Sequence, residues 1–160
     1  MSEQKAIFMD RSGYVEPQPE LWEPAIVKGA DFRAEIKRLS ELPKPNNGRR
    51  QSWIVHPDSH KLGTGLGLAP GIRPILEVLN PGEQTAPIRH NSTQVNFCIE
   101  GAGHSIVSGQ KIAFEQYDLW NFPSMQTYIH VNDTDQVQAR LTYTNAPLLE
   151  KMNVHIVEEN

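Results

Sequence analysis

Two histidines, a glutamine and a tyrosine, grouped in two short segments, are residue types that can carry out proton transfer or bind a metal. His90 and Gln94 are four positions apart, and Tyr128 and His130 are two apart in a later segment. Alternate residues of a strand point to the same side, so Tyr128 and His130 share a face if their segment is extended. An imidazole beside a phenol can exchange protons with a bound molecule, and imidazoles also bind metal ions. The pattern indicates a site for proton transfer or for metal binding.

Turn residues separate the segments that carry these residues, as they separate the strands of a closed β structure. From residue 72 onward, short apolar stretches alternate with turn residues such as Asn80-Pro81-Gly82 and Asn132-Asp133. Short strands at regular spacing are typical of a barrel or sandwich. We predict an all-β barrel with strands at 52–56, 75–79, 94–99, 104–107, 112–114, 119–122, 126–131 and 137–144, and one more at 154–157.

The first part of the chain has a different pattern. Residues 1 to about 30 carry prolines among acidic residues, which favours an extended arm that Tyr14 and Trp22 could anchor on the barrel or on a neighbouring subunit. Apolar residues then recur at helical spacing from Asp31, the expected N-cap, to a stop at Pro43. This one short helix should pack its apolar face on the barrel, and a partner-binding helix is the less favoured alternative. The expected division is an arm and helix in residues 1–50 and a barrel in residues 51–160.

Composition and charge exclude several classes of protein. The chain has 160 residues and a formal net charge of −4, which suits one globular domain and offers no basic stripe for nucleic acid. The adjacent basic pair Arg49-Arg50 is interpreted as part of a solvated loop. No apolar run is long enough to span a membrane, and the polar N-terminus lacks the features of a signal peptide.

The chain has one cysteine, Cys98, so an intramolecular disulfide is excluded. Cys98 lies in an apolar run between Phe97 and Ile99, and we expect it to behave as a small buried hydrophobic residue. A single buried thiol and the lack of a secretion signal favour the cytoplasm as the compartment.

The spacing of Gly82, Ile88, His90, Gln94 and Gly101 resembles the first sequence motif of the cupin superfamily. That motif runs Gly, five residues, His-x-His, three or four residues, Glu, six residues, Gly. The matching positions here are Gly82, Ile88 with His90, Gln94 and Gly101, and every interval agrees.

The second cupin motif is matched in the same way. It runs Gly, five residues, Pro-x-Gly, two residues, His, three residues, Asn, and the matching positions are Tyr117, Pro123 with Met125, Tyr128 and Asn132. The amino-acid sequence around these positions resembles the gentisate 1,2-dioxygenase branch of the superfamily over residues 70 to 147. The resemblance implies a single cupin domain, a double-stranded β-helix or jelly-roll barrel. The residues that carry the likeness to this branch are Pro81-Gly82-Glu83, Arg89-His90, Phe97, Glu100-Gly101, Asp118-Leu119, Pro123, His130 and Asn132.

The resemblance also implies where a metal would bind. In a metal-bearing cupin the four positions hold His, His, Glu and His, which suit ferrous iron. Here they hold Ile88, His90, Gln94 and Tyr128, so His90 is the only standard ligand that remains. We therefore expect no metal cofactor, with a divalent metal such as iron as the alternative. In that case His130 or His104 would have to complete the ligand set.

Three functions follow from this sequence. In the first, His90 and Tyr128 act as general base and acid on a small aromatic or carboxylic compound. In the second, a metal-dependent dioxygenase cleaves an aromatic ring with unusual ligands. In the third, the barrel binds a small ligand without catalysis, and the same residues are hydrogen-bonded or packing groups. The predicted substrate contacts are Gln94, Asn96, His104 and His130.

The remaining residues with chemical potential are given structural roles. Arg89 should point out of the barrel by strand alternation. His56, His60 and His155 lie outside the cupin frame and are interpreted as surface or structural residues, and Trp53 and Trp120 as core. The arm and the last strand both lack a covering surface, so we expect a homodimer.

Overall fold

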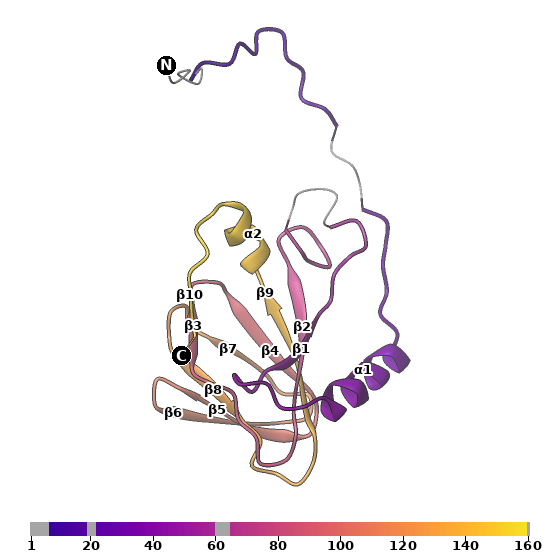
Figure 1. The fold of residues 1–160 in the computed structure, drawn as a ribbon, viewed down its shortest axis with the longest axis vertical. Helices are drawn as coiled ribbons and strands as arrows, with labels where there is room; N and C mark the ends of the chain where they lie inside the picture. Colours follow the sequence, from indigo (N-terminus) through magenta and orange to yellow (C-terminus); the bar gives the residue numbers. More distant parts are fainter. Residues whose placement is uncertain (1–6, 19–21, 60–64, 160) are drawn as a thin grey trace.

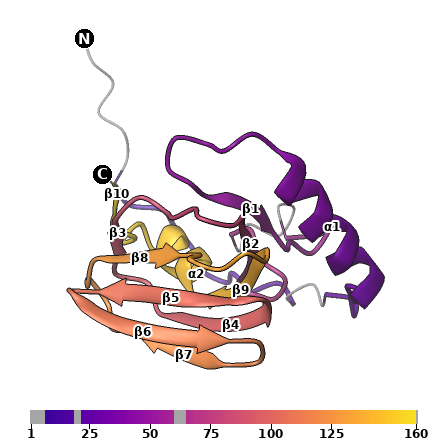
Figure 2. The same cartoon turned by 90° about the horizontal axis from the view of Figure 1, so that it is seen from below.

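The computed structural model describes residues 7–18, 22–59 and 65–159 of the chain. Two five-stranded sheets face each other, and every pairing between neighbouring strands is antiparallel (Figures 1 and 2). This confirms the predicted all-β jelly-roll barrel. The first sheet has the order β1 (Arg50–Trp53), β2 (Arg73–Leu79), β9 (Gln138–Thr144), β4 (Gln94–Glu100) and β7 (Leu119–Phe122). The second has the order β10 (Val157–Glu159), β3 (Ile88–His90), β8 (Tyr128–Val131), β5 (Ala102–Val107) and β6 (Gln110–Glu115).

Helix α1 (Gly29–Glu41) covers the outer side of the first sheet, as its apolar spacing predicts. Ile36 and Leu39 pack against Leu76, Val78 and Ala139 in one buried cluster. The N-cap prediction was wrong by three residues, because Lys28 is the N-cap and the helix begins at Gly29. The residue predicted as N-cap, Asp31, lies inside the first turn, and its Oδ2 accepts a hydrogen bond from the backbone N–H of Lys28 at 3.2 Å.

The predicted short helix is α1, and the structure adds a second helix, α2 (Ala146–Lys151), that was not predicted. Asn145-Ala146-Pro147 was interpreted only as the end of a strand. Proline is well tolerated in the first turn of a helix, where its missing N–H has no partner to lose. Here Pro147 lies in that first turn, directly after β9.

The glycine positions of both cupin motifs keep a left-handed backbone, even where glycine has been replaced. Gly82 and Gly101 have φ angles of 78° and 79°, and a Cβ on Gly101 would lie 2.3 Å from the carbonyl oxygen of Val137. Tyr117 and Met125 occupy the glycine positions of the second motif with φ angles of 73° and 63°. A side chain in this conformation costs about 1–2 kcal/mol, so the surrounding barrel imposes these turns.

The two motifs meet at the closed end of the barrel. The backbone N–H of Gly82 donates to the carbonyl of Asn132 at 2.8 Å, and that of Asn132 donates to the carbonyl of Glu83 at 2.9 Å. The buried Asn132 side chain also donates to the carbonyl of Leu79 at 3.0 Å. The last residue of the second motif is therefore bonded to the end of β2 and to the turn that begins the first motif.

The N-terminal arm leads away from the barrel (Figure 1). Trp22 stacks on the ring of the buried His56 with the two centroids 4.9 Å apart, so it anchors the inner end of the arm within the same chain. Tyr14 is exposed and holds the guanidinium of Arg11 over its ring. Among the described residues, no helix combines the length and the hydropathy that membrane spanning requires.

Candidate functional site

A cavity of about 340 Å³ opens between the two sheets, and α2 and β10 contribute to its wall. Its floor is polar, and its sides mix apolar and charged groups. This size and mixture suit a small molecule. The lining includes Ile75, Ile88 and Val157 among its apolar residues and Gln51, Ser92, Thr142 and Thr144 among its uncharged polar residues.

Three residues from three strands meet at the floor of the cavity. His90 Nε2 lies 2.8 Å from Gln94 Oε1 and 2.9 Å from the hydroxyl oxygen of Tyr128. The Tyr128 hydroxyl in turn donates to Gln94 Oε1 at 2.9 Å. β3, β4 and β8 each supply one of the three, so the structure brings together the positions that the cupin spacing relates. Ile88, the fourth position, pairs directly with Tyr128 across the β3–β8 ladder.

Buried neighbours fix the orientation of the Gln94 amide. Gln94 Nε2 donates to Asn96 Oδ1 at 2.9 Å, and the same oxygen accepts a hydrogen bond from the hydroxyl of Thr142 at 2.9 Å. With its nitrogen engaged there, Gln94 directs its carbonyl oxygen to the cavity floor. A carbonyl oxygen has two lone pairs and can accept from both His90 and Tyr128.

Ser92 supports the other side of the His90 ring. His90 Nδ1 lies 2.8 Å from the Ser92 hydroxyl and 3.1 Å from the Ser92 carbonyl oxygen. It can accept from the hydroxyl or donate to the carbonyl, so both neutral tautomers have partners. A protonated ring would also find an acceptor at each nitrogen, because Gln94 Oε1 faces Nε2.

Burial keeps the titratable groups of the floor uncharged near neutral pH. Desolvation lowers the pKa of His90 below its usual value, and hydrogen bonds to Gln94 and Ser92 offset only part of that effect. Desolvation also raises the pKa of Tyr128 to about 12. His130 lies deeper, and burial together with the charges of Arg140 and Arg49 holds its pKa well below the usual range.

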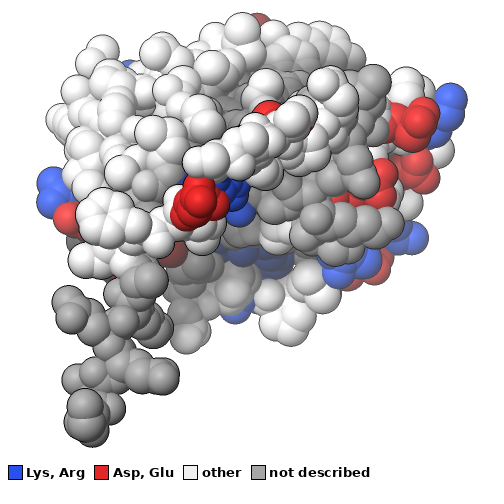
Figure 3. All heavy atoms as spheres, turned by 90° about the horizontal axis from the view of Figure 1, so that it is seen from above, with Lys and Arg blue, Asp and Glu red and all other residues white. Residues whose placement is uncertain are grey.

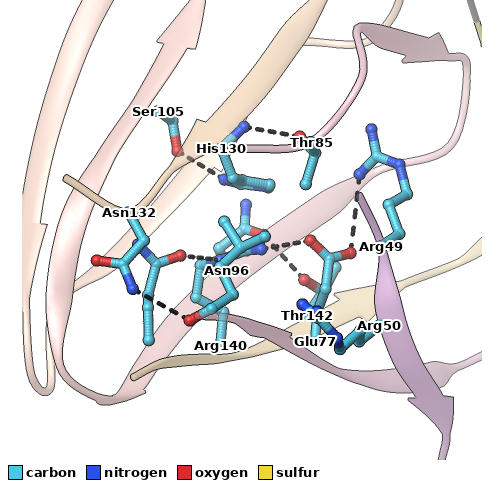
Figure 4. Close-up of polar contacts among 12 residues, drawn as sticks. Arg49, Arg50, Glu77, Thr85, Asn96, Ser105, His130, Asn132, Arg140 and Thr142 are labelled. Atoms are coloured by element: carbon cyan, nitrogen blue, oxygen red, sulfur yellow. Dashed lines mark hydrogen bonds and ion pairs between the residues drawn. The ribbon is translucent and has the colours of Figure 1, made fainter. Parts of the chain in front are cut away.

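A buried ion cluster lies beside the floor (Figure 4). The Glu77 carboxylate pairs with the guanidinium of Arg140 and lies 3.7 Å from that of Arg49. Burial alone would raise the pKa of Glu77, but the two guanidinium groups outweigh it and hold that pKa below its ordinary value. The guanidinium of Arg49 is also 6.0 Å from the centre of the Tyr128 ring, within cation–π range.

The interpretation of Arg49-Arg50 as a solvated loop was wrong. Both side chains are about 95% buried, with 6% and 4% of their surface exposed. Arg49 donates from Nε to Glu159 at 2.9 Å and from Nη2 to the carbonyl of Ala86 at 2.7 Å. Arg50 is held by a bidentate contact with Glu83. The carboxylates that neutralise this pair, Glu159 and Glu83, are distant in sequence. A short basic run gives no indication of such partners.

A second ion pair lies at the cavity wall. Arg73 donates to both carboxylate oxygens of Glu150 in α2, at 3.0 and 2.7 Å, and its guanidinium lies 3.7 Å above the ring of Trp53. Trp53 is 45% exposed and lines the cavity, so its expected place in the core was wrong. His155 lines the cavity too, 3.7 Å from Glu150, although it was interpreted as lying outside the site.

The other predicted substrate contacts lie at different depths. Asn96 is fully buried beneath Gln94, and His130 is buried with its Nδ1 2.9 Å from the Ser105 hydroxyl. The prediction that His104 points inward was wrong, because Ser105 and His130 face each other across the β5–β8 ladder and leave His104 on the opposite face. There its Nδ1 lies 3.4 Å from Asp133, in a separate surface hollow. Arg89 points outward and pairs with Glu158, as predicted.

Sequence reasoning missed the charged residues of the cavity wall. Within β2, Arg73, Ile75 and Glu77 alternate along one face of the strand, and all three line the cavity. Charged residues at this spacing in an otherwise apolar buried strand were the available signal, since a buried charge needs a partner. His60, another residue considered, lies outside the described residues.

The comparisons with known proteins agree with this geometry. Residues 75–145 match the family model for the Cupin domain. The structure superposes on a salicylate 1,2-dioxygenase from Pseudoaminobacter salicylatoxidans solved in complex with gentisate, with a TM-score of 0.80 over 94% of this chain and 24% identity. The barrel has the cupin fold. At this identity the structural likeness concerns the fold alone.

Two relatives of the cupin chain support the resemblance to the gentisate 1,2-dioxygenase branch. This chain is 30% identical over 118 residues to a 5-nitrosalicylic acid 1,2-dioxygenase from Bradyrhizobium, and the match covers 73% of this chain. It is 29% identical over 143 residues to a gentisate 1,2-dioxygenase from Streptomyces, with 88% of this chain covered. The chain spans 55% and 38% of the length of these relatives and 42% of the solved chain.

The buried neutral His130 of this cupin predicts a loss of stability in acid. Its folded pKa lies below the unfolded value of about 6.5, so below that pH only the unfolded chain takes up the proton. Between about pH 6.5 and pH 5 this should cost about 2 kcal/mol. Urea unfolding should show that this fall in pH lowers the free energy of unfolding less in His130→Asn than in wild type. A His104→Asn control should keep the wild-type slope, and an equal slope in all three proteins would contradict the account.

Proposed function

We propose that this cupin binds a small acidic or aromatic compound in the cavity and acts on it by proton transfer through His90 and Tyr128. The observation that carries the proposal is the contact of His90 Nε2 with the Tyr128 hydroxyl at 2.9 Å at the floor of a lined cavity. Both His90 and Tyr128 can take these roles in the uncharged form that they have near neutral pH. In the tautomer with its proton on Nδ1, which donates to the Ser92 carbonyl, His90 begins as a neutral base with a free lone pair on Nε2, and Tyr128 begins as a neutral acid.

The surroundings of His90 support the role of general base. When Nε2 accepts a proton from the substrate, the ring becomes an imidazolium with two N–H donors. Gln94 Oε1 at 2.8 Å and the Ser92 carbonyl at 3.1 Å can then accept from both. Tyr128 can donate its hydroxyl proton to a developing oxyanion on the substrate, which completes a transfer between two sites of one molecule. Reactions of this class include isomerisation, dehydration, cyclisation and decarboxylation.

The cationic groups of the wall support an acidic ligand. Arg49 and Arg73 both line the cavity, and a guanidinium matches a carboxylate in shape and charge. The apolar surface of Ile75 and Ile88 suits the ring or chain of such a compound. The names of the relatives agree with this class, since gentisate and 5-nitrosalicylic acid are both aromatic acids.

The four metal-ligand positions of the cupin frame favour this function over metal chemistry. Ile88 has no donor atom, Gln94 offers a neutral amide, and Tyr128 would have to lose a proton despite its raised pKa. The remaining donors already satisfy one another by hydrogen bonds. Among the described residues, no group of three or more His, Cys, Asp or Glu has the arrangement of a metal site. We infer that the residues present do not form the usual three-histidine iron centre.

Removing either proton-transfer group should abolish most of the activity. Wild type would be incubated with a panel of hydroxylated benzoic acids that includes gentisate and salicylate, and products followed by mass spectrometry. For a substrate that is turned over, His90→Ala and Tyr128→Phe should each lower kcat by about 100-fold or more.

The matched controls are His104→Ala and Tyr143→Phe, which change the same residue types outside the cavity. They should keep wild-type kcat. Undiminished turnover in both His90→Ala and Tyr128→Phe would contradict the catalytic roles. A ligand that binds and is recovered unchanged would favour a non-catalytic binding protein instead.

A metal-dependent dioxygenase is the second candidate, and the relatives' names favour it. Metal analysis of protein purified without chelator separates the two. Our proposal predicts iron, manganese, nickel, copper and zinc all well below one equivalent per chain, because the donor set is too weak to retain them. Stoichiometric metal that is lost in His90→Ala would contradict it and support the dioxygenase.

We also propose that the cupin pairs as a homodimer. The arm exposes Ile7, Phe8 and Val15 almost completely, and Tyr117 and Leu119 on the barrel are about two-thirds exposed. Large apolar side chains in such numbers favour a covering partner, and a second copy is the simplest. Light scattering should give about twice the chain mass of 18.1 kDa. A mass of one chain at micromolar concentration would overturn the dimer.

A further inference from the structure

The cavity wall contains a short strand that is weakly held. β10 has three residues, all of them exposed, and it pairs only with β3 at the edge of the second sheet. Its residues Val157 and Glu159 line the cavity, while Glu158 points outward to Arg89. Few buried contacts and an edge position are features of segments that open locally.

Glu159 provides a resident carboxylate for Arg49. Arg49 Nε donates to Glu159 Oε1 at 2.9 Å, which is the shorter of the two carboxylate contacts of this guanidinium. The other, with Glu77, is 3.7 Å long, and Glu77 is already engaged by Arg140. The Glu159 side chain is one-third exposed, whereas the Arg49 side chain is 6% exposed. The buried cation is thus neutralised from the cavity side by a group on an exposed edge strand.

The formal charges of the cavity wall balance with Glu159 in place. Arg49 and Arg73 face Glu77, Glu150 and Glu159, and Arg140 behind Glu77 supplies the third positive charge. On the face of the molecule that Figure 3 shows, acidic and basic side chains lie next to one another in small groups, and neutral surface separates these groups. A ligand that brings one more carboxylate must therefore replace one of the three, or remain without a counter-ion at a large desolvation cost.

Glu159 is the carboxylate that can leave at the lowest cost. Glu77 is 92% buried between two guanidinium groups, and Glu150 makes a bidentate contact with Arg73 from a helix. Glu159 makes one charged hydrogen bond from a three-residue strand.

We propose that a ligand's carboxylate displaces Glu159 from Arg49 and thereby releases β10 from β3. The inference rests on the proposed binding of an acidic compound in this cavity. It makes Glu159 an internal competitor that sets the affinity of the site for monocarboxylates, and it makes β10 the part of the wall that opens on binding.

The structure limits the opening to β10. The Asn91 side chain accepts from the backbone N–H of Ile156 at 2.8 Å and donates to the carbonyl of Val154 at 2.8 Å. A third bond joins the Asn91 N–H to the Ile156 carbonyl at 3.1 Å. These bonds hold the chain immediately before β10. Because β10 pairs with the strand that carries Ile88 and His90, its release also uncovers the edge of the catalytic strand.

Calorimetry with benzoate, an aromatic monocarboxylate, tests the competition. Glu159→Gln removes the competing charge and keeps the shape, so it should bind benzoate about five-fold or more tightly than wild type. Glu115→Gln is the matched control, because it makes the same change on β6, outside this cavity and away from β10, and its affinity should stay within about two-fold. Benzamide, which is uncharged, should bind all three proteins alike.

Hydrogen exchange of wild type provides a readout that needs no variant. Saturating benzoate should speed the exchange of the backbone amides in residues 157–159 and leave Ile156 protected. Benzoate binding with equal affinity in wild type and Glu159→Gln, or slower exchange in β10, would overturn the displacement and leave the proposed function intact. Failure of benzoate to bind either protein would contradict the proposed acidic ligand, and with it this inference.

Discussion

The burial of Glu77 between Arg140 and Arg49 is the constraint on which the site depends. A carboxylate removed from water is costly unless it is paired, so β2 and β9 must keep the register that places Glu77 and Arg140 together. The same requirement draws Arg49 out of solvent and onto the cavity wall. Removing one partner of such a group typically costs about 3–5 kcal/mol, more than any surface contact in the barrel supplies.

The two guanidinium groups also affect the chemistry of the floor. Their charges add to burial in keeping His130 neutral, and Arg49 has the same effect on His90. A metal cation at the floor would find one imidazole, one amide and one neutral phenol as ligands. The same setting favours a neutral histidine base and a protonated tyrosine. Charge and hydrogen bonding at the floor therefore favour proton transfer over metal-dependent chemistry, although the cupin fold can support both.

Turn spacing and strand alternation are local properties, and from them the sequence predicted the barrel. The convergence of His90, Gln94 and Tyr128 was predicted from the resemblance to the two cupin motifs. The sequence predicted nothing of the contact between Arg49 and Glu159, since 110 positions separate them and only the closed barrel brings them together. His104 was misplaced because alternation fixes which residues share a face but leaves open which face is inside. The strand boundaries also shifted, with β1 beginning at Arg50 and β10 beginning only at Val157.

The central claim is that the former metal-ligand positions now form a hydrogen-bonded, neutral proton-transfer site. Nitrogen NMR of the His90 ring during a zinc titration tests it most directly, because the two ring nitrogens report protonation, hydrogen bonding and metal binding separately. The account predicts a neutral ring at about pH 6.5 whose signals do not change with one equivalent of Zn²⁺. A saturable shift of Nε2 at one equivalent, absent in Tyr128→Phe, would contradict it.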